Sequence, residues 1–137
     1  MSQFYFLSVA SLLFGGVLAA ADFLSERVGA FAPLADLAER RGLIMTTGVI
    51  TLAVGIFKIF IQAPGDGIPV AGDLLPAIAG IATGGVLLLS GMQRRPQVGA
   101  DTPPPPPPAV VEYKSPIGLA GLIVGLLHFL FPAAVIL

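Results

Sequence analysis

Lys58 and His128 are ionisable residues that lie inside long apolar stretches of this 137-residue sequence. Titratable groups are costly in an apolar medium, so they often mark a polar path or an interface between helices. Lys58 lies close to the end of its stretch, where a lysine can also extend to the lipid headgroups as an anchor. His128 lies deeper, and its imidazole can either hydrogen-bond to a neighbouring helix or transfer protons.

Asp66 and Asp73 follow Lys58 at a distance that lets their carboxylates face it. Both have structural alternatives, since Asp66 precedes a glycine in a typical turn pair and Asp73 stands where a helix N-cap is expected. These two aspartates, with Lys58 and His128, are therefore candidates for a polar path or an interface.

Recognisable catalytic arrangements are missing from the sequence. Its one histidine and its lack of cysteine leave no nucleophile beside a base, and His128 has no carboxylates at the spacing that a metal site needs. The glycines between Gly80 and Gly85 are not followed by the lysine of a phosphate-binding loop. We therefore expect a protein without enzymatic activity, cofactor or metal ion.

The composition indicates a membrane protein. Hydrophobic residues make up 55% of the chain and charged residues only 11%, whereas an ordinary soluble domain carries about a quarter charged residues. A bilayer removes the need for a polar shell, because lipid-facing surface can be apolar. The net charge of −1 argues against a nucleic acid partner, which requires a concentrated basic surface.

Four apolar windows have the length of about 20 residues that a membrane-spanning helix needs. They are 4–24, 43–62, 74–92 and 117–137. The first window can alternatively be a cleaved signal peptide, with the alanines 19–21 as its cleavage site. The absence of Lys and Arg before Phe4 favours a retained span.

Basic residues predict the orientation of these four spans. Two connecting segments carry three each, namely Arg27, Arg40 and Arg41 in one and Arg94, Arg95 and Lys114 in the other, whereas the turn at 63–73 carries none. Cytoplasmic loops are enriched in Lys and Arg, so both termini and the turn are expected on the outer side of a bacterial plasma (inner) membrane. Asp22, at the inner end of the first span, is expected to pair with Arg27 or Arg40.

The two cytoplasmic segments differ in character. Within 28–41, Leu34, Leu37 and Ala38 share one helical face, which predicts a short amphipathic helix at the membrane interface or a solvated helical turn. Within 93–115, the six prolines 103–108 predict polyproline II. Such a segment is either a stiff spacer or a ligand for an aromatic groove.

The two halves of the chain resemble each other. Residues 15–18 match 84–87 with an offset of 69, and residues 48–58 match 118–128 with an offset of 70. The second match aligns Lys58 with His128. A duplicated two-span unit predicts parallel repeats, related by an axis along the membrane normal.

Small residues recur at helix-packing spacing in all four windows, and they include Gly15, Gly55, Gly80, Gly84, Gly121 and Gly125. Small side chains let helix backbones approach closely where lipid provides no hydrophobic driving force. These glycines are therefore candidate helix-packing positions.

The predicted fold is an all-α membrane protein with four transmembrane helices in two parallel-repeat hairpins and a short interfacial helix. Its parts are a first hairpin at 1–62, an outer turn at 63–73 and a second hairpin at 74–137. The first functional hypothesis is a non-enzymatic subunit or scaffold of a larger membrane assembly, in contact with lipid and with other subunits or copies of itself. The alternative is a homo-oligomeric channel or small transporter with Lys58 and His128 near a polar path. A membrane-embedded enzyme is the least favoured hypothesis.

Overall fold

The computed structural model describes residues 2–60, 70–93 and 106–131, and every regular element in these ranges is helical. In chain order the elements are α1 (Ser2–Ala19), α2 (Ala21–Arg27), the 3₁₀ helix η1 (Gly29–Phe31), α3 (Ala32–Glu39), α4 (Arg41–Phe60), α5 (Val70–Gln93), α6 (Ala109–Glu112) and α7 (Lys114–Leu130). The all-α prediction is therefore confirmed.

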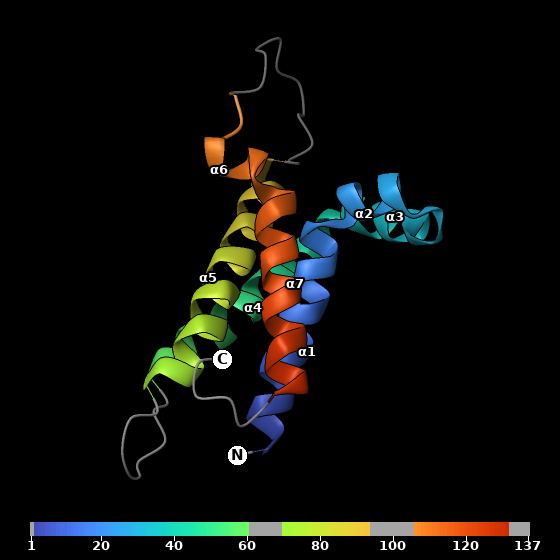
Figure 1. Ribbon diagram of the computed structural model, residues 1–137. Coiled ribbons are helices and arrows are strands. Elements are labelled where there is room, and N and C mark those ends of the chain that lie inside the picture. Colours follow the sequence, from blue (N-terminus) through green and yellow to red (C-terminus); the bar gives the residue numbers. More distant parts are fainter. Residues whose placement is uncertain (1, 61–69, 94–105, 132–137) are drawn as a thin grey trace.

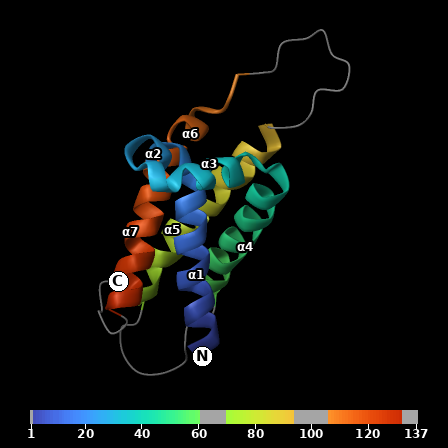
Figure 2. The ribbon, with the colours of Figure 1, turned by 90° about the vertical axis from the view of Figure 1, so that its right-hand side faces the viewer.

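Four long helices, α1, α4, α5 and α7, lie side by side and form a bundle (Figure 1). Helix α4 packs most extensively on α5, and α1 packs most extensively on α7. Helices α2, α3 and α6 lie at one end of the bundle, and α2 and α3 run across its axis (Figures 1 and 2). The start of α1 lies at the opposite end. The names follow the topology that the sequence predicts: we call this end the outer end and the end with α2, α3 and α6 the inner end.

The outside of the bundle is unusually apolar for a protein dissolved in water, although its core is apolar as well, with Leu12, Leu18 and Ile44 fully buried. Large apolar side chains are exposed along its long helices, among them Phe6, Phe14, Phe57, Ile123 and Phe129. Hydroxyl side chains are buried between the helices: Ser8, Ser11, Thr47, Thr51, Thr83 and Ser90. An exposed apolar surface of this extent marks contact with a membrane or with other proteins.

Two helices are long and apolar enough to cross a membrane, namely α4 and residues 74–93 of α5. They coincide with the predicted windows 43–62 and 74–92. Helices α1 and α2 meet the same criteria together but are bent by 65°, and the apolar helix α7 is shorter. By length and composition, the described residues thus contain two spans, or three if the bent pair is one span.

The first predicted window, 4–24, does not form one straight helix. Helix α1 ends at Ala19, and α2 leaves at an angle of 65°. The reason is the charge of the next segment, since α2 carries Asp22, Glu26 and Arg27, which favour a course along a polar interface over a continued apolar one. The fourth window, 117–137, begins slightly late, because α7 starts at Lys114; its residues beyond 131 lie outside the described ranges.

The start of α5 also differs from the prediction. The helix begins at Val70, so Asp73 belongs to its first turn and is not its N-cap. Pro76 lies inside the helix, where it removes one backbone hydrogen bond close to an end that is already incompletely bonded. This small loss lets the apolar residues from Val70 onward extend the helix.

Helix α3 is amphipathic, as the segment 28–41 predicts. Leu34 and Leu37 pack against a cluster of buried residues at the inner end, and Ala38 is fully buried. Asp36 and Glu39 are exposed on the other side. The helix therefore covers the inner end of α1 with its apolar face.

Candidate functional site

Lys58, His128 and Tyr5 meet at the outer end of the bundle, where α1 begins and where α4 and α7 end. Lys58 Nζ lies 3.1 Å from His128 Nε2, and the two residues are only 7% and 4% exposed. The Tyr5 hydroxyl donates a hydrogen bond of 2.5 Å to the backbone oxygen of His128, and the centroids of the two rings are 5.0 Å apart. Three helices thus converge on one polar cluster, of which the sequence did not predict Tyr5.

The contact between Lys58 and His128 restricts where protons can be. A protonated lysine offers three donors and no acceptor, so it bonds to His128 only when Nε2 carries no proton. The imidazole is then neutral, with its proton on Nδ1. If both groups were protonated, two donors and two positive charges would face each other in a buried site. The pair therefore holds one proton between its facing nitrogens, and protonation of both breaks the bond.

Side chains, not backbones, join α4 to α7 at this cluster. In the described residues the two helices make no close backbone approach to each other, since each packs mainly on its own neighbour. The hydrogen bond between Lys58 and His128 therefore closes the bundle between these two helices. Hydrogen bonds between membrane helices contribute on the order of 1 kcal/mol each.

The two predicted aspartates of the outer turn are not placed by the structure. Asp66 lies outside the described residues, and for Asp73 only the backbone, as part of α5, is described. A role for either beside Lys58 stays a prediction.

Glycines lie where α4 and α5 cross most closely. A Cβ atom added at Gly55 would lie 2.8 Å from the backbone nitrogen of Ile81, and one added at Gly80 would lie 3.2 Å from the Cα atom of Gly55. A Cβ atom at Gly84 would collide with the backbone of Leu52. The two helices therefore touch through their backbones.

A second backbone contact joins α1 to α7. A Cβ atom added at Gly16 would lie 2.7 Å from the nitrogen of Leu122, and one added at Gly118 would lie 2.7 Å from the nitrogen of Ala20. One added at Gly125 would lie 3.0 Å from the Leu12 Cβ atom. The predicted packing set contains Gly15 and omits Gly16, the next residue, which lies on the neighbouring helix face. Spacing alone does not choose between these adjacent faces.

Gly15 and Gly121 face threonine side chains. A Cβ atom at Gly15 would lie 2.9 Å from Thr51 Oγ1, and one at Gly121 would collide with the hydroxyl of Thr83. The Thr51 hydroxyl donates to the backbone oxygen of Ser11 at 3.2 Å. The Thr83 hydroxyl is fully buried and, within the described part of the chain, has no hydrogen-bond partner.

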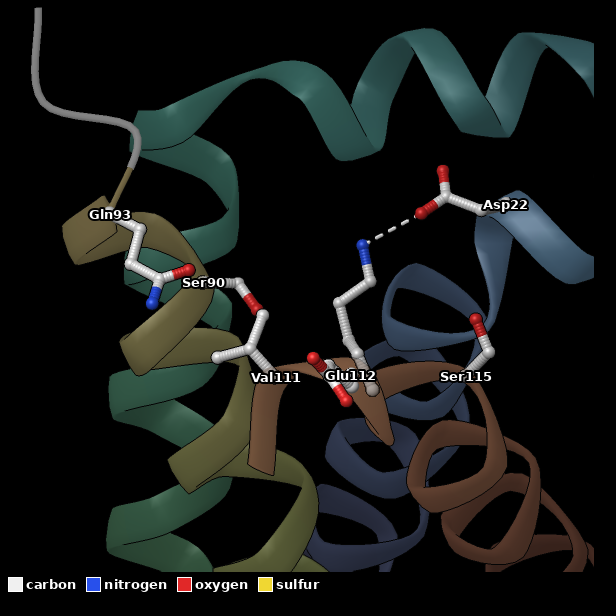
Figure 3. Close-up of a pocket in the computed structure, with 7 residues that line it drawn as sticks. Asp22, Ser90, Gln93, Val111, Glu112 and Ser115 are labelled. Carbon is white, nitrogen blue, oxygen red and sulfur yellow. Dashed lines mark hydrogen bonds and ion pairs between the residues drawn. The ribbon is translucent and has the colours of Figure 1, made fainter. Parts of the chain in front are cut away.

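A polar cavity of about 360 Å³ lies at the inner end (Figure 3). Its lining comes from α2, α5, α6 and α7, and it comprises Asp22, Ser90, Gln93, Val111, Glu112, Lys114 and Ser115. Across it, Lys114 Nζ donates to Asp22 Oδ2 at 2.9 Å. The Lys114 side chain is 10% exposed and that of Asp22 is 54% exposed, so the ion pair is accessible to water on one side.

The ion pair corrects the predicted partner of Asp22. The bend after α1 directs the carboxylate toward the start of α7, so Asp22 pairs with Lys114 and not with Arg27 or Arg40. Arg27 instead lies over the ring of Phe23, 5.1 Å from its centroid. In the ranges described, no three His, Asp, Glu or Cys side chains gather as metal ligands would.

Comparison with known proteins places the chain in a family. A family model matches residues 1–128. An uncharacterized protein of Treponema pallidum (strain Nichols) is 33% identical over 132 residues, which cover 96% of this chain and 95% of the Treponema protein. No solved structure matches the chain. The chain therefore belongs to the same family as this Treponema pallidum protein.

Proposed function

We propose that this protein crosses the membrane four times and works without catalysis, as a subunit or scaffold of a larger membrane assembly. The observation that carries the proposal is the apolar outside of the bundle, where large side chains such as Phe6, Phe57 and Phe129 are exposed. Such a surface is stable in lipid or against another apolar protein surface.

The lengths of α1 and α7 support four crossings. Their 18 and 17 residues extend about 27 Å and 26 Å at 1.5 Å per residue, close to the hydrocarbon thickness of about 30 Å. Both helices also lie alongside α4 and α5, so all four cross the same layer. Arg27, Arg40, Arg41 and Lys114 belong to the inner end, which supports a cytoplasmic inner end and an outer N-terminus in a bacterial plasma membrane.

The closed interior favours a scaffold over a channel. Backbone contacts at Gly55 and Gly84 leave no space between α4 and α5, and buried hydroxyls such as those of Thr51 and Ser90 donate to backbone oxygens. A conduction path needs polar groups that face an open lumen. Because the glycine faces are used inside the bundle, contacts with other subunits fall on its apolar outer surface.

A small transporter is the second candidate, and the Lys58–His128 pair favours it. The pair holds one proton between two nitrogens 3.1 Å apart, beside the Tyr5 ring, and buried ionisable groups in membrane proteins often handle ions or protons. In reconstituted vesicles, Lys58→Ala and His128→Ala should both change proton or ion flux if this candidate is right. Unchanged flux in both variants removes it.

Native mass spectrometry in mild detergent tests the subunit proposal. The protein extracted from its own membrane should be detected together with other membrane proteins in fixed stoichiometry. Detection of a discrete homo-oligomer alone contradicts the proposal. A variant with one exposed phenylalanine replaced by alanine, Phe57→Ala, is a control for non-specific apolar association.

The proposal includes two hairpins, at 1–62 and 74–137, that insert with the same orientation. It is supported by the two close crossings, because each joins one helix of the first hairpin to one helix of the second. In a pair of hairpins related by a twofold axis, α1 corresponds to α5 and α4 to α7. The crossing of α4 with α5 then corresponds to that of α7 with α1.

A further inference from the structure

The residues at the two close crossings correspond by constant shifts. Where α4 meets α5 the contacts involve Gly48, Leu52 and Gly55, and where α7 meets α1 they involve Gly118, Leu122 and Gly125, each 70 positions later. Their partners are Leu88, Gly84 and Ile81 in α5 and the residues 68 positions earlier, which are Ala20 directly after α1 and Gly16 and Leu13 within it. The contacts therefore match Gly84 with Gly16, one residue away from the match with Gly15 that the sequence predicts.

The contacts within each hairpin obey the same shifts, with the residue types exchanged. Gly15 of α1 faces Thr51 of α4, and Thr83 of α5 faces Gly121 of α7. Position 83 follows position 15 by 68, and position 121 follows position 51 by 70. Each hairpin thus pairs one glycine with one threonine. The first helix carries the glycine in the first hairpin and the threonine in the second.

Two contacts join residues to their own equivalents. A Cβ atom at Gly15 would lie 3.5 Å from Thr83 Cγ2, and Lys58 lies 3.1 Å from His128, 70 positions later. In a twofold arrangement, a residue can touch its equivalent only beside the axis. These two contacts, one inside the bundle and one at its outer end, therefore mark the line of the axis.

Both contacts on this line are complementary because the two residues differ. The Thr83 methyl group lies at ordinary van der Waals distance from the position of a Gly15 Cβ atom, and Lys58 donates to the nitrogen that His128 offers. Two copies of the first hairpin would instead place lysine against lysine, with two donors and two like charges. Two copies of the second hairpin would place threonine against threonine, which is overpacked.

We propose that four residues determine the specificity with which the two hairpins pair, namely Gly15, Thr83, Lys58 and His128. Through these residues the first hairpin fits the second hairpin of the same chain and does not fit the first hairpin of a second copy. The inference rests on the proposed four-span bundle. Since α4 and α7 carry the same Gly–Leu–Gly contacts, the remaining contacts would accept either hairpin. The axis pairs therefore prevent exchange of hairpins between copies.

Exchanging the members of each pair in the full-length protein tests this inference. His128→Lys and Gly15→Thr should each lower the melting temperature in detergent by several degrees and increase the fraction of dimer. The swap Lys58→His/His128→Lys and the fourfold swap Gly15→Thr/Thr51→Gly/Thr83→Gly/Gly121→Thr, which also exchanges the contacts within each hairpin, should recover at least half of each loss and restore the monomer. Recovery of less than half in both swaps overturns the inference.

A metal-binding variant keeps the test decisive if His128→Lys does not fold. Lys58→His places two imidazoles beside the axis, where they can supply two of the four ligands of a Zn²⁺ ion, with water in the other two positions. Zn²⁺ should raise the melting temperature of this variant but not that of the wild type or of Lys58→Ala. No Zn²⁺-dependent shift in Lys58→His overturns the axis contact. The proposed assembly with other subunits is tested separately by native mass spectrometry, so the two proposals can fail independently.

Discussion

The two ends of the bundle are both joined by lysine hydrogen bonds, but in different environments. At the outer end, Lys58 and His128 are buried, and Lys58 Nζ lies 3.1 Å from His128 Nε2. At the inner end, Lys114 bonds to the half-exposed Asp22 beside a polar cavity. Water screens the inner pair and not the outer one. The outer bond therefore acts as a packing element, and the inner bond acts as a surface ion pair.

The closed middle of the bundle separates the two ends, and opening it should have the largest effect. Gly84→Ala adds a methyl group against the backbone of Leu52, which forces α4 and α5 apart and should cost about 3 kcal/mol. Thermal unfolding in detergent measures the loss. The control is Gly85→Ala, where no atom lies within 4 Å of an added Cβ; it should be neutral or stabilising by up to about 1 kcal/mol. Equal losses in the two variants contradict the close crossing.

Removing the outer bond should have the next largest effect. His128→Leu leaves the buried ammonium of Lys58 without this acceptor, so the protein should lose about 2 kcal/mol of stability. The loss should persist in 1 M salt, because a buried group is weakly screened. A double-mutant cycle with Lys58→Met should give a coupling of about 1 kcal/mol. No coupling would mean that the two side chains do not interact.

Removing the inner ion pair should have a smaller effect. Asp22→Asn keeps the shape of the side chain and removes its charge, and a partly exposed pair of this kind contributes below about 1 kcal/mol. The difference from wild type should shrink further in 1 M salt. A salt-independent loss as large as that of His128→Leu would contradict the distinction between the two ends.

The smallest effect is expected at Thr83. Its hydroxyl is buried with no partner in the described residues, so Thr83→Val removes an unpaired polar group at nearly constant shape and should be neutral or stabilising by about 1 kcal/mol. Thr51→Val is the matched control, because it removes the hydroxyl that donates to Ser11 and should destabilise. The reverse order of the two melting temperatures contradicts this assignment.

Hydropathy predicts the long helices well where the apolar run and the helix end together. The windows 43–62 and 74–92 lie on α4 and α5, because Lys58 is the one charged residue that the two windows contain. The window 4–24 hides the bend after Ala19, because Phe23 and Leu24 continue the apolar run past Asp22. The charges that favour the bend lie at the end of the window and just beyond it, so mean hydropathy does not mark it.

The candidate site is predictable only in part, because the sequence identifies its residues but not all of their contacts. Alignment of the halves places Lys58 and His128 at equivalent positions, but only the arrangement of helices brings them within 3.1 Å. Lys114, the partner of Asp22, is 92 residues away, whereas local reasoning favours the nearby Arg27. Contacts between helices that are far apart in the sequence depend on how the helices pack. The spacing of residues within one sequence does not reveal that packing.

Thiol labelling in intact cells tests directly whether the protein is a membrane bundle in which α1 begins on the outer side of the membrane. The chain contains no cysteine, so Gln3→Cys at the outer end and Asp36→Cys on α3 each introduce one exposed thiol. We expect a membrane-impermeant maleimide to label Gln3→Cys in intact cells and to label Asp36→Cys only after lysis. Labelling of Asp36→Cys in intact cells, with Gln3→Cys protected, would contradict the account.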